Sequence, residues 1–265
     1  MIFLKTDDEI ELLRQSNLLV GKTLAELAKV IKPGVTTKEL DKVAEEYIRD
    51  NGATPTFKGF PNFKGASFPA SICTSVNEQV VHGIPSDVVL KDGDIVSVDC
   101  GTYMNGFCGD SAYTFPVGEV SDSVLHLLKT TKEALYKGIE NAVSGKRLGD
   151  IGSAVQEYCE NESFGVVREF VGHGIGKEMH EDPMVPNYGK RGNGILLKNG
   201  LCIAIEPMIT LGDRHIVMER DGWTVRTVDH SCAAHFEHTI AIRKGKADIL
   251  SSFKFVEEVL GEKAI

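Results

Sequence analysis

Five residues far apart in the sequence have side chains that can hold metal ions. They are four carboxylates and one imidazole, at Asp99, Asp110, His173, Glu206 and Glu237. Burying four carboxylates side by side is costly unless cations compensate their charge. Carboxylates joined by one imidazole favour manganese, iron, cobalt or zinc over calcium. The set therefore predicts a site for two divalent metal ions, whose common chemistry is hydrolysis by an activated water.

Asp99 and Asp110 flank Asn105-Gly106, a dipeptide typical of two-residue hairpin turns. With this turn, Asp99 would oppose Ala112 in the partner strand. Asp110 would oppose Gly101, so that both carboxylates project from one face, roughly 7 Å apart at the backbone. That spacing suits two ions about 3.5–4 Å apart that share one carboxylate. Taken singly, each aspartate is more simply a strand end or a turn residue, and their shared face is what favours metal binding.

The two glutamates also stand at the ends or on the faces of expected strands. Glu206 follows the apolar run 201–205, so its carboxylate ends a buried strand. Glu237 lies in the alternating segment 233–240, which is typical of a strand, and shares a strand face with His235. A solvent-facing carboxylate is the alternative for Glu237 taken singly.

Three histidines are candidates for the same site. His173 is framed by two glycines, which let the backbone approach a ligand closely. A two-metal hydrolase also needs neutral donors beside the scissile carbonyl and amide nitrogen, and His82 and His180 are the candidates for these roles. For each of these two, the alternative is a structural histidine bonded to the backbone.

Two pairs of helices are expected to position these residues, with β-branched runs typical of strands between and after the pairs. The first two helices begin at capping boxes, Thr6 with Glu9 and Thr36 with Glu39. The first ends before Lys32-Pro33-Gly34. The second helix is expected to end near residue 51. The later pair of helices is expected over residues 121–143 and 149–161.

The chain also matches itself, as a duplicated unit would. Residues 90–99 lie over residues 197–206 without a gap and with an acid at the end of each, and Gly34 matches Gly145 at nearly the same offset. Two such halves would pack their sheets around a pseudo-twofold axis, with the acids near that axis and helices on the outer face. The sequence thus predicts one α+β domain over residues 1–265, with internal halves of about 6–118 and 119–245.

The composition is that of an ordinary globular protein with a net charge of −9, which disfavours broad nucleic-acid binding. No apolar run is long enough to cross a bilayer, and the start lacks the features of a signal peptide, so a cytoplasmic protein is expected. The six cysteines form no CxxC pair, which favours reduced, buried thiols over disulfides or a zinc knuckle: Cys73, Cys100, Cys108, Cys159, Cys202 and Cys232.

The chain resembles the type I methionine aminopeptidases, which share the pita-bread fold with aminopeptidase P, prolidase and creatinase. The matching motifs are Val81-His82-Gly83-Ile84-Pro85, Val98-Asp99-Cys100-Gly101, Gly109-Asp110, Gly172-His173-Gly174-Ile175-Gly176, Met179-His180-Glu181, Ile205-Glu206-Pro207 and Phe236-Glu237-His238-Thr239. The resemblance covers almost the whole chain. It implies a pita-bread fold, with pseudo-twofold halves and a central, curved, mainly antiparallel sheet covered by helices on its outer face.

The spacing of the motifs indicates which branch of this fold family the chain resembles. The short interval between Glu206 and Glu237 leaves no room for the helical insertion that is typical of type II enzymes. The little sequence before the first expected helix argues against the aminopeptidase P and prolidase branch. The type I branch is therefore the one expected.

The resemblance also implies a role for each ligand. One metal ion would be held by Asp99, Asp110 and Glu237, and the other by Asp110, His173, Glu206 and Glu237. A water between the two ions would attack the carbonyl of the first residue, and Glu206 would accept its proton. The free α-amine of the substrate would sit against the ion held by Asp99, which explains why only chain ends are cut.

The substrate contacts implied by the resemblance surround these ligands. His180 would polarise the carbonyl oxygen, and His82 would contact the scissile amide. An apolar pocket for the methionine side chain would be walled by Phe60, Phe68, Cys73, Met179 and Trp223. The sequence departs from many relatives in its phenylalanines where tyrosines are common, in Met179 where an aromatic is common, and in an insertion over residues 61–67. Core packing is the alternative for each aromatic side chain.

The predicted activity is removal of the initiator methionine from new polypeptides whose second residue is small, with two divalent ions (Co, Mn, Fe or Zn). The expected partners are N-terminal methionyl peptides and nascent chains, with transient ribosome contact, for a monomer that binds neither membranes nor specific nucleic acids. One alternative is an Xaa-Pro aminopeptidase or dipeptidase of the same fold. Another is a non-catalytic protein of this fold that holds nascent chains, but such a protein is expected to lose metal ligands, and all five are present.

Overall fold

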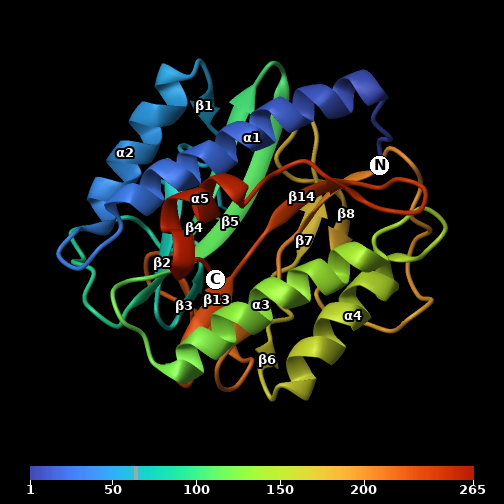
Figure 1. The fold of residues 1–265 in the computed structure, drawn as a ribbon. Helices are drawn as coiled ribbons and strands as arrows, with labels where there is room; N and C mark the ends of the chain where they lie inside the picture. The colour runs from blue at the N-terminus through green and yellow to red at the C-terminus, as the bar shows by residue number, and fades with distance from the viewer. Residues whose placement is uncertain (63–64) are drawn as a thin grey trace.

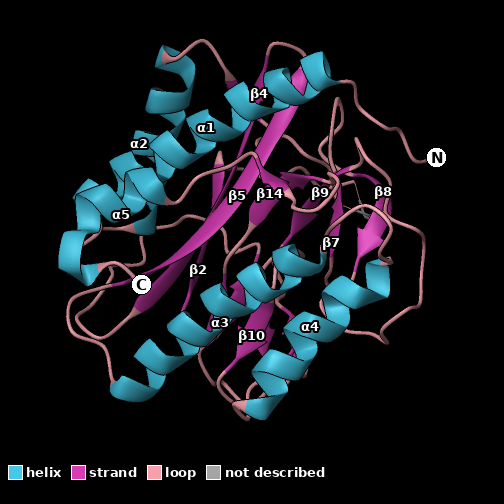
Figure 2. Ribbon diagram, turned by 45° about the vertical axis from the view of Figure 1, so that its right-hand side comes forward, coloured by secondary structure: helices cyan, strands magenta, loops and turns pink. Residues whose placement is uncertain are grey.

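A computed structural model describes residues 1–62 and 65–265 as antiparallel sheets that carry helices on one face (Figure 1). The helices are α1 (Asp7–Val30), α2 (Thr37–Asp50), α3 (Asp122–Asn141), α4 (Leu148–Asn161), α5 (Lys254–Leu260) and the 3-10 helix η1 (Gly261–Lys263). In Figure 2 the pairs α1–α2 and α3–α4 lie on either side of the long strands β4 and β5. Helices and sheets together confirm the α+β class.

Both predicted capping boxes begin helices. At the start of α1, the backbone N–H of Thr6 donates to the Glu9 carboxylate over 2.9 Å, and the N–H of Glu9 donates to the Thr6 hydroxyl over 3.3 Å. Thr36 and Glu39 repeat both bonds at the start of α2, over 2.7 and 3.2 Å. These bonds satisfy N–H groups that have no partner inside the helix. The later helices α3 and α4 lie within two residues of their predicted ranges.

The first sheet contains the predicted hairpin. Its strands are β1 (Thr54–Pro55), β2 (Ile72–Val76), β4 (Ile95–Met104) and β5 (Phe107–Pro116), with β4 paired to the other three. Asn105 and Gly106 both have positive φ, 54° and 84°, as a type I′ turn requires. Asp99 pairs with Ala112 and Gly101 with Asp110, so the predicted register is confirmed.

The remaining strands form one five-stranded and two three-stranded sheets. The five-stranded sheet has the order β15–β14–β9–β7–β8, and the smaller sheets have the orders β13–β10–β6 and β11–β12–β3. Their bounds are β3 (Gln79–Val81), β6 (Gly165–Val166), β7 (Gly172–Gly174), β8 (Glu181–Val185), β9 (Cys202–Ile205), β10 (Met208–Thr210), β11 (Ile216–Met218), β12 (Val225–Thr227), β13 (Ala233–His235), β14 (His238–Ala241) and β15 (Asp248–Ile249). All pairings between these strands are antiparallel, as expected, but hydrogen bonding divides the strands into separate sheets.

The same backbone hydrogen bonds recur in the two predicted halves. The N–H of Gly34 donates to the carbonyl of Leu90 over 2.8 Å, and the N–H of Gly145 donates to the carbonyl of Leu197 over 3.0 Å. Both glycines have a φ of 96°, which a residue with a Cβ rarely adopts. The turns before β4 and β9 are therefore held in the same way against the turns before α2 and α4. The boundaries of the halves stay a prediction.

The predicted continuous strand over residues 233–240 is wrong in one respect, because it breaks at Phe236 and Glu237 between β13 and β14. The facing strand breaks at Glu206 and Pro207, between β9 and β10. His235 pairs with Met208 on one side of the break, and His238 pairs with Ile205 on the other, in the same register. Glu206 and Glu237 therefore face each other where the backbone ladder is interrupted.

The chain segments of the two predicted halves join along a seam between residues 110–114 of β5 and residues 235–239. The N–H of Glu237 donates to the carbonyl of Ala112 over 2.9 Å, and the Ser111 hydroxyl donates to the carbonyl of Glu237 over 2.6 Å. Further along, the Thr239 hydroxyl donates to the carbonyl of Asp110 over 2.9 Å. The seam thus brings Asp110 and Glu237 side by side.

Apolar side chains pack beneath the helices and behind this seam. Tyr113 and Phe236 are fully buried, and their ring centroids lie 4.9 Å apart. The six cysteines are unpaired, and five of them are buried while Cys232 is partly buried, so the expected burial is confirmed for five. Within residues 1–62 and 65–265, no helix has the length and apolar content needed to span a membrane.

Candidate metal centre

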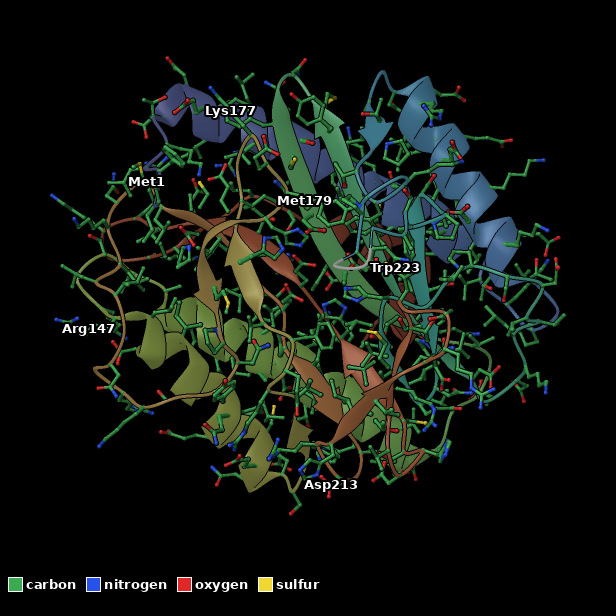
Figure 3. All side chains as sticks on the ribbon, turned by 180° about the vertical axis from the view of Figure 1, so that it is seen from behind. Met1, Arg147, Lys177, Met179, Asp213 and Trp223 are labelled. Atoms are coloured by element: carbon green, nitrogen blue, oxygen red, sulfur yellow. The ribbon has the colours of Figure 1, made fainter. Side chains whose placement is uncertain are left out.

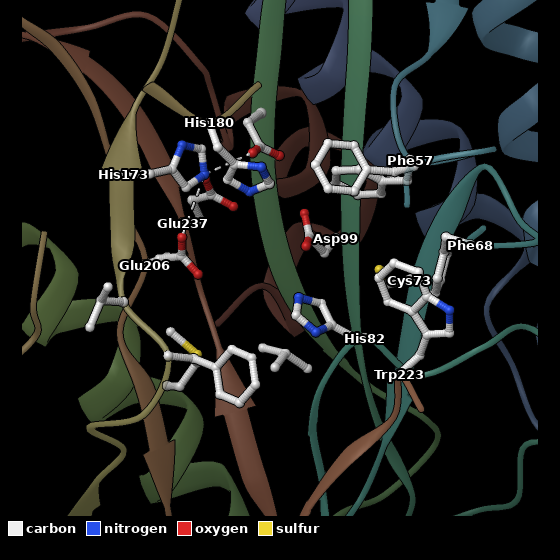
Figure 4. A pocket seen from close by; sticks show the side chains of 16 residues that line it. Phe57, Phe68, Cys73, His82, Asp99, His173, His180, Glu206, Trp223 and Glu237 are labelled. Carbon is white, nitrogen blue, oxygen red and sulfur yellow. Dashed lines mark ion pairs between the residues drawn. The ribbon is translucent and has the colours of Figure 1, made fainter. Parts of the chain in front are cut away.

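The five predicted metal ligands line one cavity of about 180 Å³. Figure 3 views the molecule from the face opposite the helices, where Met179 and Trp223 mark the region of this cavity. In the close view of Figure 4, His173, Glu206 and Glu237 lie on one side and Phe68, Cys73 and Trp223 on the other, with Asp99 and His82 between them. The cavity therefore has an acidic end and an apolar end.

Asp110, His173 and Glu237 form the tightest group. One donor atom from each lies within 4.8 Å of the others, and all three residues are buried. The Nε2 atom of His173 is 3.5 Å from Asp110 Oδ2 and 3.7 Å from Glu206 Oε1. Its Nδ1 lies 2.9 Å from the carbonyl oxygen of Gly174, a bond that requires the proton on Nδ1 and leaves the lone pair on Nε2 directed at the carboxylates.

The carboxylates contain buried oxygens with no hydrogen-bond partner among the described residues: Asp99 Oδ1, Asp110 Oδ1 and Glu237 Oε1. Buried polar atoms without a partner are rare in folded proteins and indicate an additional group. A divalent cation would satisfy these carboxylate oxygens. A complete hydrogen-bond network among protein groups would not leave them without partners.

Burial raises the pKa of each carboxyl group in the cluster. The pKa of Asp110 rises to about 8 because its carboxyl is removed from water. Burial first, and then repulsion from neighbouring carboxylates, raises the pKa of the other three well above their ordinary values: Asp99, Glu206 and Glu237. Four acids that resist ionisation together form a site that divalent cations would stabilise in the charged form.

His82 and His180 both line the cavity. Burial lowers the pKa of each to about 4, helped for His82 by His180 and for His180 by His173, so both rings are neutral near pH 7. Among the described residues neither ring has a hydrogen bond, and the expected backbone partner of a structural histidine is not seen. His82 adopts a φ of 59°, a conformation that β-carbon-bearing residues seldom take and that places its ring edge-on to Phe170 and Trp223.

The apolar end contains four of the five predicted wall residues, Phe60, Phe68, Cys73 and Trp223. Phe68 and Trp223 meet edge to face with ring centroids 5.1 Å apart. Met179 does not line the cavity. It is buried behind it, where its methyl group packs against Gly101 in a space that a Cβ on Gly101 would fill.

Other lining residues were not predicted from the sequence: Phe57, Val81, Phe170, Val171 and Met208. Phe57 lies close before Phe60 in the sequence, and Met208 lies close after Glu206. Their nearness to predicted site residues is the one sequence feature that could have indicated them. His235 was noted only for sharing a face with Glu237, and its ring lies 3.6 Å from Glu206. The predicted insertion over residues 61–67 includes residues 63 and 64, which lie outside the described residues, and its ends pair at Pro61 and Ser67.

Comparisons with known proteins agree with this geometry. Residues 11–244 match the pattern of metallopeptidase family M24. The methionine aminopeptidase of Clostridium acetobutylicum is 53% identical over 95% of this chain and 99% of its own length. The crystal structure of methionine aminopeptidase from Thermotoga maritima superimposes with a TM-score of 0.91, at 44% identity over 95% of this chain and 100% of that one.

A structure from another group of enzymes shares the fold alone. The Xaa-Pro dipeptidase from Bacillus anthracis superimposes with a TM-score of 0.72 at 23% identity. This chain covers 62% of that structure, which in turn matches 94% of this chain.

Proposed function

This chain belongs to metallopeptidase family M24 and has its pita-bread fold, and we propose that it is a metal-dependent aminopeptidase that removes the N-terminal methionine of polypeptides. The observation that supports methionyl polypeptides as the substrate is the 53% identity to a methionine aminopeptidase over nearly the full length of both chains. The Xaa-Pro alternative is not favoured, because the similarity to the Xaa-Pro dipeptidase, at 23% identity, extends to the fold alone. The non-catalytic alternative is not favoured either, since the candidate ligands all line one cavity.

The residues present fit divalent cations. The buried, unpartnered oxygens of Asp99, Asp110 and Glu237 and the free Nε2 of His173 are donor atoms that such ions accept. In this proposal Asp99 would help to hold one ion, His173 and Glu206 would help to hold the other, and Asp110 and Glu237 would contribute to both. Manganese, iron, cobalt and zinc all suit this donor set. When bound, a pair of such ions supplies an acidified water and polarises the substrate carbonyl.

Glu206 is the residue that would accept the proton of the attacking water. Its carboxylate follows β9 directly and lines the cavity beside the other candidate ligands, where it would take up a proton and then return it to the leaving amine. Both steps are general acid–base catalysis by one carboxyl group. The lining of the cavity shields them from bulk water.

His180 and His82 would bind the peptide bond as neutral hydrogen-bond donors. Their pKa values of about 4 leave one N–H and one lone pair on each ring near pH 7. His180 would donate to the carbonyl oxygen as negative charge develops on it, and His82 would contact the scissile amide. Neither ring has a hydrogen-bond partner among the described residues, so the N–H group of each is available to substrate.

The apolar end of the cavity would hold the methionine side chain. Phe60, Phe68, Cys73 and Trp223 line an apolar space, and sulfur–aromatic contacts favour a thioether there. Phe57 supplies a further wall that the sequence did not indicate. We propose that a small second residue is preferred, and that the enzyme acts as a cytoplasmic monomer on nascent chains, with transient ribosome contact and no binding to nucleic acids or membranes.

Peptide hydrolysis tests this function. The protein is stripped of metal, reloaded with Mn²⁺ or Co²⁺, and incubated with Met-Gly-Met, with peptides that vary the second residue, and with Xaa-Pro peptides. We expect release of methionine, fastest when the second residue is small. Cleavage confined to the Xaa-Pro peptides would refute the proposal, and the absence of any turnover with either metal would favour the non-catalytic alternative.

A further inference from the structure

His235 is a buried imidazole at the edge of the metal centre that none of the roles above uses. It ends β13 with 2% of its surface exposed. Its backbone is fixed on the seam, where its N–H donates to the Thr114 hydroxyl over 2.9 Å and the same hydroxyl donates to its carbonyl over 2.7 Å. Pairing with Met208 holds the other side. The backbone of His235 is therefore held on both sides, and burial leaves its ring little room to turn.

The ring nitrogen Nε2 has no hydrogen-bond partner among the described residues, although it is fully shielded from water. It faces Glu206, with 3.6 Å between Nε2 and Oε2. The other oxygen of Glu206, Oε1, lies 3.7 Å from Nε2 of His173. Glu206 is thus placed between two imidazoles, and each imidazole faces a different oxygen.

The two imidazoles present different atoms to this carboxylate. His173 uses its Nδ1 proton on the Gly174 carbonyl, so its Nε2 offers a lone pair. A lone pair on the Nε2 of His235 would face a carboxylate oxygen that is also an acceptor. The favourable arrangement places the proton on Nε2 of His235, so that this ring donates to Oε2. A small rotation of the Glu206 side chain would shorten the 3.6 Å between these atoms to hydrogen-bond length.

We propose that His235 is a positioning residue, whose Nε2–H donates to Glu206 Oε2 and holds Oε1 turned towards His173 and the metal centre. Partners of this kind fix the orientation of metal ligands and raise their affinity for the ion. The inference rests on the proposed function only in taking Glu206 as a metal ligand. It does not depend on which peptide is cleaved.

Calorimetric titration of metal-free protein with Mn²⁺ tests the proposal without any substrate. His235→Leu removes the donor and is expected to weaken Mn²⁺ affinity about 10–100-fold, the usual cost of losing such a partner. His235→Gln keeps an N–H donor of similar reach and is expected to restore most of the affinity. With a methionyl peptide, kcat should fall for the leucine variant while KM changes little.

The matched control is His238→Leu. His238 is a buried imidazole three residues away, bonded to Ser251 over 2.6 Å and to Tyr136 over 3.2 Å, and stacked on Phe253 rather than facing the cavity. Its loss should lower stability and leave Mn²⁺ affinity unchanged. An equal loss of affinity in this control would point to general loosening and overturn the positioning role.

Two further outcomes would overturn the proposal: wild-type Mn²⁺ affinity in His235→Leu, or equally weak binding in the leucine and glutamine variants. If the leucine variant does not fold, His235→Asn replaces it, because the shorter amide cannot reach Glu206; equal affinities of the asparagine and glutamine variants would then overturn it. A wild-type protein that binds no Mn²⁺ would refute the proposed function and this inference together. Mn²⁺ binding without methionyl peptide cleavage would leave the positioning role standing.

Discussion

Asp110 is the residue on which the proposed chemistry depends most, because its carboxylate lies against both His173 and Glu237 and is shared between the ions in the proposal. Asp110→Asn preserves the shape and removes the charge. We expect methionine release to fall by at least about 100-fold, since the loss of a residue that merely orients a ligand already costs 10–100-fold. The measurement is kcat/KM on Met-Gly-Met with saturating Mn²⁺.

The control for this variant is an aspartate outside the cavity. Asp87→Asn changes an exposed carboxylate that pairs only loosely with Lys38, at 3.4 Å, and should keep wild-type kcat/KM. Circular dichroism should show both variants folded. Near-normal turnover by Asp110→Asn would mean that Asp110 is not the shared ligand.

At the residue scale, the sequence indicates which charged residues line the cavity more reliably than it indicates which apolar residues do. Asp99 and Asp110 are predictable because a two-residue turn fixes which side chains share a face. Met179 is misplaced because its neighbour in sequence, His180, does line the cavity, and nothing in the local pattern tells which of two adjacent side chains turns inwards. Phe57 and Phe170 are missed because an aromatic residue in a loop has no periodicity from which to infer its direction.

At the scale of elements, the seam between β5 and residues 235–239 is what holds ligands from the two predicted halves together. Thr114→Val removes the hydroxyl that bonds both the N–H and the carbonyl of His235. Leaving these buried groups unpaired should cost about 1–3 kcal/mol of unfolding free energy. Because the seam also fixes Glu237, Mn²⁺ affinity should fall as well. Urea unfolding and calorimetry measure the two effects.

Thr131→Val is the matched control for the seam. Its hydroxyl is also buried and bonds a backbone carbonyl, that of Leu127 over 2.7 Å, but within helix α3. This variant should leave Mn²⁺ affinity at the wild-type value, whatever its effect on stability. If Thr114→Val binds Mn²⁺ as tightly as Thr131→Val does, the seam is not what holds the ligands in place.

Elements defined by short-range chemistry are predicted well. The capping boxes at Thr6 and Thr36 and the hairpin at Asn105-Gly106 depend on contacts within a few residues, and all three occur as expected. The break at Phe236 and Glu237 is different, because the register stays the same across it while the backbone pairing with the facing strand is interrupted. The sequence of residues 233–240 therefore predicts a single strand. The interruption becomes visible only in the structure, where it lies opposite the break at Glu206 and Pro207.

For the whole molecule, the internal match predicts that acids of two halves meet but not which strands bring them together. The pairing of β3 with β12 and of β6 with β10, and the side-chain bonds from β5 to residues 235–239, join segments far apart in the chain. Such contacts depend on how complete faces pack, which local patterns do not encode. The duplicated segment itself is visible in the sequence because equivalent turns need equivalent glycines.

The metal-free protein should lose stability as pH rises from about 6.5 to 8. Burial raises the folded-state pKa of Asp110 to about 8 and raises those of its three partners, whereas unfolded carboxyl groups titrate near 4. In this window the folded state binds more protons than the unfolded state, so stability present at low pH is lost as pH rises through the folded pKa. Each proton concerned contributes at most about 1.4 kcal/mol per pH unit.

The window is set by the buried histidines, which act in the opposite direction. Burial lowers their folded pKa values to about 4 for His82, His173 and His180 and to about 3 for His235 and His238, so the unfolded chain binds more protons between those values and about 6.5. Above about pH 6.5 this contribution levels off, because fewer than half of the unfolded imidazoles still bind a proton, and the carboxyl effect prevails towards pH 8. Urea unfolding in the presence of a chelator should show the decline, with a shallower slope for Asp110→Asn. A flat profile in wild type would contradict it.

Mn²⁺ should reverse this decline, because a cation binds the deprotonated carboxylates and releases the protons that the metal-free cluster retains. Saturating Mn²⁺ should therefore stabilise the folded protein, and the gain should increase between pH 6.5 and 8 as less work is needed to remove those protons. Thermal unfolding with and without Mn²⁺ across this range measures the gain. In Asp110→Asn the gain should be smaller and depend less on pH. A gain in wild type that does not change with pH would show that Mn²⁺ binds somewhere other than this buried cluster of acids.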